Sequence, residues 1–280
     1  MSEAGNENDN DNGWMTPDWS ACGAVPHGVG ALQTTRQSLN GVSAAPYDAF
    51  NLALHVDDDP AAVQANRRQL RQHLPAEPLW LEQVHGIGVV DADDDNALVP
   101  AVMPPRADAS FSRRPGRVCA VMTADCLPLL LAARDGSVVA AAHAGWRGLA
   151  AGVIEATVAA MTAITKVSAT TKALPAEELV VWLGPAIGTR AFEVGAEVRT
   201  AFCRQDELAE QAFVALPSRD GQEKWHCDLA LLARQRLMAL GVRFIGGGQW
   251  CTFSDPQHFY SHRRDGTSGR MATLIWKKEG

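Results

Sequence analysis

The sequence lacks the features that would place it in a membrane, a secretory pathway or a nucleic-acid complex. Its apolar runs fall short of the roughly 18 to 20 residues of a membrane-spanning helix. Residues 1–13 contain neither the basic nor the apolar region of a signal peptide. The net charge of -7 disfavours nucleic acid and anionic membranes, because both attract basic surfaces. We therefore expect a cytoplasmic protein with a small-molecule substrate, no nucleic-acid partner and no membrane partner.

The cysteines also lack the spacing of a structural framework. Six cysteines are spread over 280 residues, and no two form a Cys-x-x-Cys pair. Disulfide scaffolds and cysteine-rich metal modules are built from much denser patterns. A chain of this length can bury roughly 75% of its unfolded surface without crosslinks. Most of the thiols are therefore predicted to be reduced and buried.

The order of predicted elements indicates the fold class. Residues 1–20 are expected to be a disordered acidic tail, and residues 21–280 a single catalytic domain. Helical patterns cover Ala61–Leu74, Leu149–Ile164, Glu193–Cys203 and Leu229–Leu240. Strand-like runs cover Leu79–Val84, Val118–Ala124, Val138–Ala142, Leu179–Leu183, Val242–Ile245 and Met271–Trp276. Their irregular alternation favours an α+β fold with mixed sheets over a doubly wound parallel sheet. The sequence does not define the oligomeric state.

Two imidazoles and one thiol lie in unusually constrained segments. His85 follows Gln-Val and precedes Gly, Cys126 lies within Ala-Asp-Cys-Leu-Pro, and His143 opens His-Ala-Gly-Trp-Arg-Gly. Each residue alone is more often an ordinary core residue. Together they suit Zn²⁺ or a copper ion, and three protein ligands leave one coordination position open for catalysis.

A predicted hairpin brings two of these groups together. Asp135-Gly136 lies between two apolar runs, which favours a two-residue type I′ turn. Counting outward from that turn, Cys126 lies opposite Gly145 and is a diagonal neighbour of His143. Their Cβ atoms are then roughly 7 Å apart or less, a gap that a shared ion can span.

Further polar residues are candidates for catalysis or substrate binding. Asp125 could act as a base, although neighbouring strand residues face opposite ways. Arg147 follows a glycine at a predicted helix start and could hold phosphate, or the glycines there simply permit a sharp turn. Arg264 lies in an arginine-rich loop, and Arg36 and Ser43 lie in a polar, turn-rich segment. We expect these four residues to bind substrate or phosphate.

Several blocks resemble signature segments of the laccase-domain family, which is also called multicopper polyphenol oxidase, purine nucleoside phosphorylase or peptidoglycan editing factor. The blocks occur in order between about Gly23 and Lys277. They are Gln83–Gly86, Thr123–Pro128, His143–Gly148, Leu183–Gly188, Phe192–Gly195, Arg263–Gly266 and Gly269–Ala272.

This resemblance implies a single-domain α/β/β/α sandwich with zinc bound by His85, Cys126 and His143. It also implies purine nucleoside and phosphate as substrates. The expected reactions are phosphorolysis of adenosine, inosine and methylthioadenosine, and deamination of adenosine to inosine. Metal-activated water would attack C6 of the adenine in the deamination.

Three alternatives stay open at this point. A copper-dependent polyphenol oxidase is compatible with two histidines and a cysteine, but a multicopper cluster needs more histidines in ligand-like groups. A cysteine hydrolase would use Cys126 as nucleophile and His143 as base. A binding module without turnover would use the same pocket.

Overall fold

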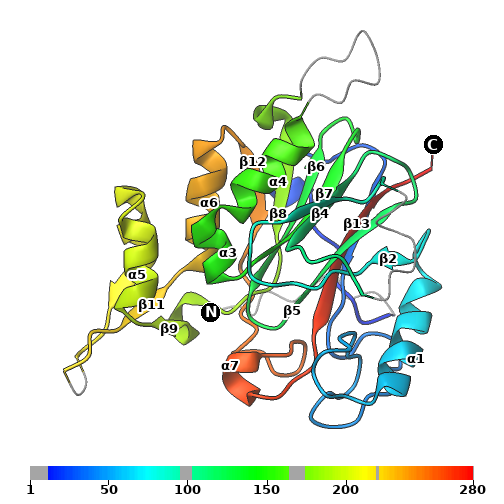
Figure 1. Ribbon diagram of the computed structural model, residues 1–280, viewed down its shortest axis with the longest axis horizontal. Coiled ribbons are helices and arrows are strands. Elements are labelled where there is room, and N and C mark those ends of the chain that lie inside the picture. Colours follow the sequence, from blue (N-terminus) through cyan, green and yellow to red (C-terminus); the bar gives the residue numbers. More distant parts are fainter. Residues whose placement is uncertain (1–11, 95–102, 164–173, 219–220, 280) are drawn as a thin grey trace.

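Two packed β-sheets form the centre of the computed structural model, which describes residues 12–94, 103–163, 174–218 and 221–279 (Figure 1). The larger sheet has the order β12 (Phe244–Gly247), β8 (Leu179–Leu183), β6 (Leu127–Ala133), β7 (Val139–Ala144), β4 (Ala109–Ser112) and β3 (Val89–Asp91). The smaller sheet has the order β1 (Val29–Gln33), β13 (Met271–Lys277), β5 (Val118–Thr123) and β2 (Pro78–Leu79). Both sheets combine parallel and antiparallel pairs.

The alternating side chains of β6 show how the layers are built. Leu129 and Leu131 pack into the cluster beneath the helices, whereas Leu130 and Ala132 pack into the cluster between the two sheets. All four side chains are fully buried. Because successive strand residues face opposite sides, a strand buried on both faces reads as a continuous apolar run.

Helices cover the outer faces of both sheets. The larger sheet is covered by α3 (Trp146–Ala151), α4 (Val153–Thr162) and α6 (Leu229–Ala239), whereas α5 (Ala196–Cys203) lies farther out and packs against α3 (Figure 1). α1 (Pro60–Arg71) lies on the side of the smaller sheet (Figure 1), and its Leu70 belongs to the same buried cluster as Ala120 and Leu274. This arrangement confirms the predicted α+β sandwich with mixed sheets.

Shorter elements complete the fold. They are β9 (Glu193–Val194), β10 (Phe213–Ala215), β11 (Trp225–Cys227), α7 (His262–Asp265) and the 3₁₀ turns Ser20–Cys22, Ala176–Glu178, Thr189–Ala191 and Glu207–Ala212. No helix among the described residues has the length and apolarity to span a bilayer.

Two predicted helices were right in their caps and two were wrong in their bounds. The side chains of Asp59 and Asp228 accept backbone hydrogen bonds at the starts of α1 and α6. The helix expected over Leu149–Ile164 is divided at Gly152, whose φ of 105° ends α3 and starts α4. The helix expected from Glu193 begins only at Ala196, because Glu193 and Val194 pair with β11.

The predicted strand Leu79–Val84 and the predicted N-terminal tail need correction. Only Pro78 and Leu79 pair with β5, so His85 lies in a loop well beyond that strand. Of the tail expected over residues 1–20, residues 1–11 lie outside the described residues. Trp14 and Met15 are buried, and Met15 forms a β-bridge with Gln33, so the packed domain begins before residue 21.

The β6–β7 hairpin has the predicted register but a different turn. Leu127 faces Ala144, and Pro128 faces His143, as the count from Asp135-Gly136 predicted. Only Gly136 has a positive φ, and its N–H donates to the Ala133 carbonyl, so the connection is longer than a type I′ turn. The hairpin ends carry Cys126 and His143 to the same edge of the sheet.

Candidate metal centre

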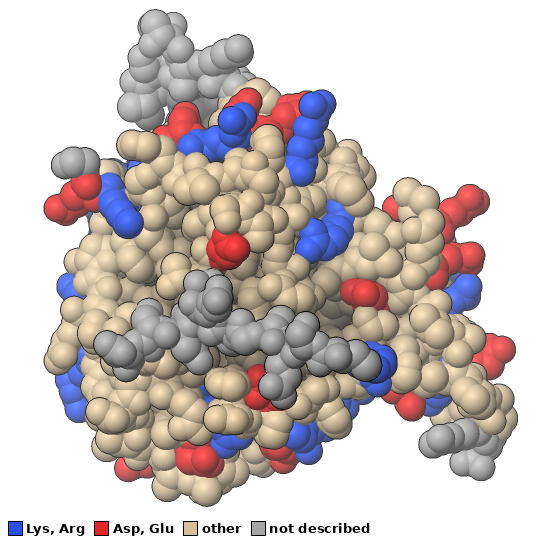
Figure 2. Space-filling model, turned by 180° about the vertical axis from the view of Figure 1, so that it is seen from behind, with Lys and Arg blue, Asp and Glu red and all other residues tan. Residues whose placement is uncertain are grey.

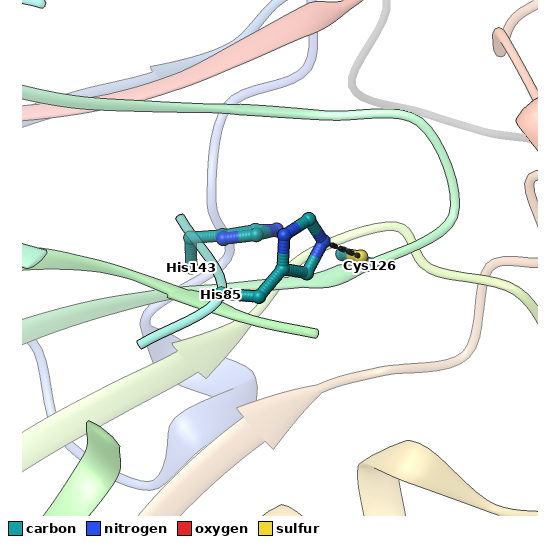
Figure 3. A group of neighbouring side chains, drawn as sticks. All are labelled: His85, Cys126 and His143. Carbon is teal, nitrogen blue, oxygen red and sulfur yellow. Dashed lines mark hydrogen bonds between the residues drawn. The ribbon is translucent and has the colours of Figure 1, made fainter. Parts of the chain in front are cut away.

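His85, Cys126 and His143 converge although they come from three separate segments (Figure 3). The sulfur of Cys126 lies 3.7 Å from Nε2 of His85, and the three ligand atoms lie within 4.8 Å of one another. The two imidazole rings meet edge to face with centroids 4.8 Å apart. His143 is buried, Cys126 is half-buried and His85 is exposed, so the cluster opens on one side.

The Gln83–Gly86 segment places His85 above β5. The side-chain amide of Gln83 donates to the Met122 carbonyl and accepts from the Met122 N–H, as a neighbouring strand would. His85 itself has a φ of 58°, in the left-handed region that non-glycine residues rarely adopt. Such backbone conformations concentrate at functional sites, where surrounding contacts hold them.

Cys126 lies in the connection between β5 and β6, where a second strained residue precedes it. Asp125 has a φ of 90°. Its carboxylate accepts hydrogen bonds from Thr252 Oγ1 at 2.6 Å and from the Arg263 N–H at 2.7 Å, and its carbonyl accepts from the Ile187 N–H. Both carboxylate oxygens are therefore engaged within the protein, which favours a positioning role over the general base suggested by the sequence.

His143 lies near the end of β7 and contacts a carboxylate that the sequence analysis missed. Its Nδ1 lies 2.8 Å from Oδ1 of Asp108, a residue with no exposed side-chain surface. The His143 N–H also donates to the Asp108 carbonyl. With Nδ1 bonded to a carboxylate, Nε2 is the nitrogen left for a metal ion.

Two glycines after His143 make room for the cluster. A Cβ atom at Gly145 would lie 2.7 Å from Cδ2 of His85 and 2.9 Å from the Cys126 sulfur. One at Gly148 would lie 2.8 Å from the Gly86 carbonyl oxygen. Neither glycine has a positive φ. Close approach to the cluster, rather than a sharp turn, therefore explains both glycines.

The cluster ionises its own thiol. Burial raises the pKa of Cys126, but the adjacent His143 and His85 outweigh burial and lower it to about 6. Burial alone would lower the pKa of His143. The charges and hydrogen bonds of Cys126 and Asp108 together outweigh burial and raise this pKa above its ordinary value. Burial also raises the pKa of Asp108, but hydrogen bonds from His143, Gly86 and His85 bring it below its ordinary value. A thiolate is thus present near neutral pH.

This donor set fits a single tetrahedral ion. Bonds of about 2.3 Å to sulfur and 2.0 Å to nitrogen separate the two donors by about 3.5 Å. The observed 3.7 Å between Cys126 and His85 is close to that value. Within the described residues, no other group of three or more histidine, cysteine or acidic side chains has ligand atoms this close. The geometry fits one ion better than a multinuclear copper cluster.

Three of the predicted binding residues use their polar groups in internal contacts. Arg36 donates to the carbonyl and carboxylate of Asp48 and to the Pro256 carbonyl. Ser43 bonds to Asp58 and Asn66. These contacts stabilise the loops between β1 and α1 and leave little capacity for a substrate.

The other two predicted arginines, Arg264 and Arg147, differ in whether their guanidinium groups are already hydrogen-bonded. Arg264 donates to both carboxylate oxygens of Asp265 and to the carbonyls of Thr252, Phe253 and Phe259. Arg147, by contrast, is exposed and has no hydrogen-bond partner among the described residues. Its guanidinium lies 4.5 Å from the centroid of the Trp146 ring.

Arg270 lies in the same arginine-rich loop as Arg264, and the sequence left open which arginine of this loop lines the pocket and which fixes the loop. Burial lowers its pKa, and the charges of Cys126 and Asp125 oppose that change, which places its guanidinium near the cluster. One terminal nitrogen donates to Ser268 and Gly269. Which arginine of the loop interacts with Cys126 depends on how β13 pairs with β5.

Known relatives agree with the expected family over almost the whole chain. A protein named purine nucleoside phosphorylase PA4543 from Pseudomonas aeruginosa is 52% identical over 268 residues, covering 96% of this chain and 100% of the relative. Purine nucleoside phosphorylase YfiH from Escherichia coli is 47% identical over 264 residues, covering 94% of this chain and 98% of the relative.

Solved structures share the fold. Protein NMB0706 from Neisseria meningitidis has a TM-score of 0.83 and 43% identity, covering 95% of this chain and 100% of the other. YlmD from Geobacillus stearothermophilus has a TM-score of 0.77 and 29% identity, covering 96% and 98%. The profile of the multi-copper polyphenol oxidoreductase laccase family matches residues 30–278. The chain therefore belongs to that family, as the resemblance of its motifs predicted.

Proposed function

We propose that this protein is a zinc-dependent enzyme of purine nucleosides, which cleaves them with phosphate and also deaminates adenosine. The observation that carries the proposal is the convergence of His85, Cys126 and His143 on one open, partly exposed position. The names of the relatives, purine nucleoside phosphorylase, supply the substrate class. When bound, zinc would act as a Lewis acid and would activate water for deamination.

We propose zinc rather than a copper cluster as the metal of this site. A thiolate and two neutral imidazoles suit both metals. Reduction of dioxygen in a multicopper oxidase would need several ions, whereas the described residues offer one three-ligand group. The alternative is a single copper ion with a polyphenol oxidase activity. Metal analysis of the purified protein distinguishes the two metals.

Two arginines are the proposed phosphate contacts. Arg147 is exposed and lacks an internal hydrogen-bond partner, and Arg270 lies near the Cys126 thiolate. In phosphorolysis, a phosphate oxygen attacks C1′ of the ribose while the C1′–N9 bond breaks and its electron pair leaves with the purine. Arginines would hold the nucleophile in line and balance its charge.

The surface beside the metal centre suits a nucleobase. Val84 and Ile87 flank the segment of His85, and their side chains are 42% and 47% exposed. Apolar side chains next to a few convergent polar groups are typical of small-molecule sites.

On the face in Figure 2, basic and acidic side chains among the described residues are interspersed. This face therefore offers nucleic acid no extended basic surface.

Product chromatography tests the proposed function. The wild-type protein is incubated with adenosine, with and without phosphate. Adenine that forms only with phosphate indicates phosphorolysis, and inosine indicates deamination. We expect Cys126→Ala to abolish both products, and Cys203→Ala, which changes a half-buried thiol outside the cluster, to retain them. Wild-type protein that yields neither product would contradict the proposal.

A cysteine hydrolase is the second candidate, because of one observation. Cys126, His143 and Asp108 form a chain of neighbours. Their residue types are those of a nucleophile, a base and an orienting acid, in that order. This alternative predicts turnover that survives complete removal of metal by a chelator. The zinc mechanism predicts loss of turnover on chelation and its return when zinc is restored.

A further inference from the structure

Asp108 receives hydrogen bonds from both histidine segments of the metal centre. Its Oδ1 lies 2.8 Å from Nδ1 of His143 and 2.9 Å from the His85 N–H nitrogen. Its Oδ2 lies 2.6 Å from the N–H nitrogen of Gly86 and 3.3 Å from that of Val84. The side chain has no exposed surface, so no bulk water substitutes for these contacts.

We propose that Asp108 is the positioning residue of the metal centre, an acceptor-only group that fixes the His143 ring and the His85 backbone together. The inference rests on the proposed function, since it concerns the same metal ion. Asp108 does not itself reach the open coordination position. It acts through the two residues that would bind the ion.

The effect on His143 concerns which ring nitrogen carries the proton. A carboxylate oxygen can only accept, so Nδ1 of His143 must donate, and in the metal-bound protein Nε2 then carries a lone pair in place of its proton. That lone pair belongs to the nitrogen left for the cluster. Carboxylates that orient metal-binding histidines in this way raise the basicity of the ligand and hold its ring plane.

The effect on His85 concerns the backbone. The N–H groups of Val84, His85 and Gly86 all point at one carboxylate, which wraps the loop around it. His85, in the middle, has a φ of 58°. Three convergent donors compensate for this strained conformation and aim the imidazole at Cys126. Removal of the Asp108 carboxylate would therefore release both the loop that carries His85 and the ring of His143.

Asparagine has the shape of aspartate but cannot replace it here. Both carboxylate oxygens face donors only, whereas asparagine offers one acceptor and one donor group. If its oxygen faces His143, its amino group opposes the Gly86 N–H. If it is turned over, its amino group opposes Nδ1 of His143 and favours the tautomer whose Nε2 carries hydrogen and cannot bind metal.

Asp93 provides a matched control at the other end of β4. Its carboxylate accepts from Ser112 Oγ at 2.6 Å and from the Arg113 N–H at 2.7 Å, and it contacts none of the three ligands. Asp93→Asn therefore perturbs a carboxylate that organises local backbone without touching the centre. A general effect of losing such a carboxylate would appear in both variants.

Zinc competition against a chromophoric chelator measures the expected effect. Asp108→Asn should lower zinc affinity by about 10- to 100-fold, the usual range for a residue that orients a metal ligand, and Asp93→Asn by less than about twofold. Zinc-loaded wild-type protein should also show, by NMR, an exchange-protected proton on Nδ1 of His143. That proton should be lost or exchange faster in Asp108→Asn.

The outcomes separate the two proposals. Wild-type protein that binds no zinc would overturn the metal centre and this inference with it. Wild-type protein that binds zinc while Asp108→Asn binds equally well would overturn the role of Asp108 alone. If Asp108→Asn does not fold, the wild-type spectrum decides, because absence of the Nδ1 proton on His143 would contradict the proposed hydrogen bond.

Discussion

Two polar clusters of this protein differ in whether their hydrogen-bonding groups are already satisfied. In the loops between β1 and α1, Arg36 and Ser43 bond to neighbouring side chains and carbonyls. In the metal centre, the thiolate of Cys126 and Nε2 of His85 face each other across 3.7 Å with His143 beside them. Both segments are rich in polar residues, but only the second brings three metal-binding side chains together at one point.

The comparison teaches how a site differs from a polar network that holds loops in place. A network bonds its donors and acceptors to one another, and its loss costs stability. A binding site keeps some ligand atoms oriented by a surrounding layer, here by Asp108 and Asp125, and directs them at a common point. Changes in the two clusters should therefore alter different measured quantities.

Removal of the thiol should have the largest effect. Cys126→Ala takes away one of three ligands, so we expect bound zinc to fall from about one ion per chain to a small fraction of that. Elemental analysis after dialysis measures this directly. Zinc retained at wild-type level in the variant would place the ion elsewhere and erase the distinction between the two clusters.

Thiol reactivity should also distinguish Cys126 from a structural cysteine on the preceding strand. In the metal-free protein its pKa of about 6 makes it largely thiolate at pH 7, whereas burial raises the pKa of Cys119 to about 12. Alkylation of Cys126 should therefore rise with pH, reach half its maximum near pH 6 and level off about one pH unit higher, and Cys119 should stay unmodified. Peptide mass spectrometry across pH follows both sites, and bound zinc should protect Cys126. Equal reactivity of the two thiols would count against an ionised Cys126.

Crowding the centre should have a smaller effect than removing a ligand. Gly145→Ala places a methyl group 2.7 Å from the His85 ring and 2.9 Å from the Cys126 sulfur, so one of them must move. We expect zinc affinity to fall by about tenfold or more, as for other losses of ligand orientation. Gly88→Ala is the control, because its nearest neighbour would lie at an ordinary 3.4 Å. Equal affinities in the two variants would refute the argument from space.

The polar network should respond in stability alone. Ser43→Ala removes the hydroxyl that bonds to Asp58 and Asn66, both of which then lose a partner. The free energy of unfolding should fall by about 0.5–1.5 kcal/mol, the usual net contribution of a hydrogen bond, because Asp58 and Asn66 each keep another partner. Chemical denaturation measures the loss, and zinc stoichiometry should not change. A substantial loss of zinc without a loss of stability would mean that Ser43 belongs to the site.

The sequence predicted the convergence of Cys126 and His143 better than the surroundings of the three candidate ligands. The β6–β7 register follows from one Asp-Gly turn and two apolar runs. The sequence could therefore predict that Cys126 and His143 lie at the same edge of the sheet. The role of Asp108 could not be predicted, because its contact with His143 depends on the pairing of β4 with β7 and joins residues 35 positions apart. The only local signal was an acidic residue immediately before a buried strand.

Local patterns also failed where one residue changes the backbone. Gly152 looks compatible with a long alanine-rich helix, but its φ of 105° divides that helix into α3 and α4. Arg36 and Arg264 looked like substrate contacts because residue type does not reveal whether a guanidinium is already bonded. Tertiary contacts decide both questions.

X-ray absorption spectroscopy of the purified wild-type protein at the zinc edge tests the central claim most directly. We predict one sulfur neighbour at about 2.3 Å and nitrogen or oxygen neighbours at about 2.0 Å, including two imidazoles. Cys126→Ala should lose the sulfur signal. A zinc shell without sulfur in the wild-type protein, or fully active protein that contains no metal, would contradict the account.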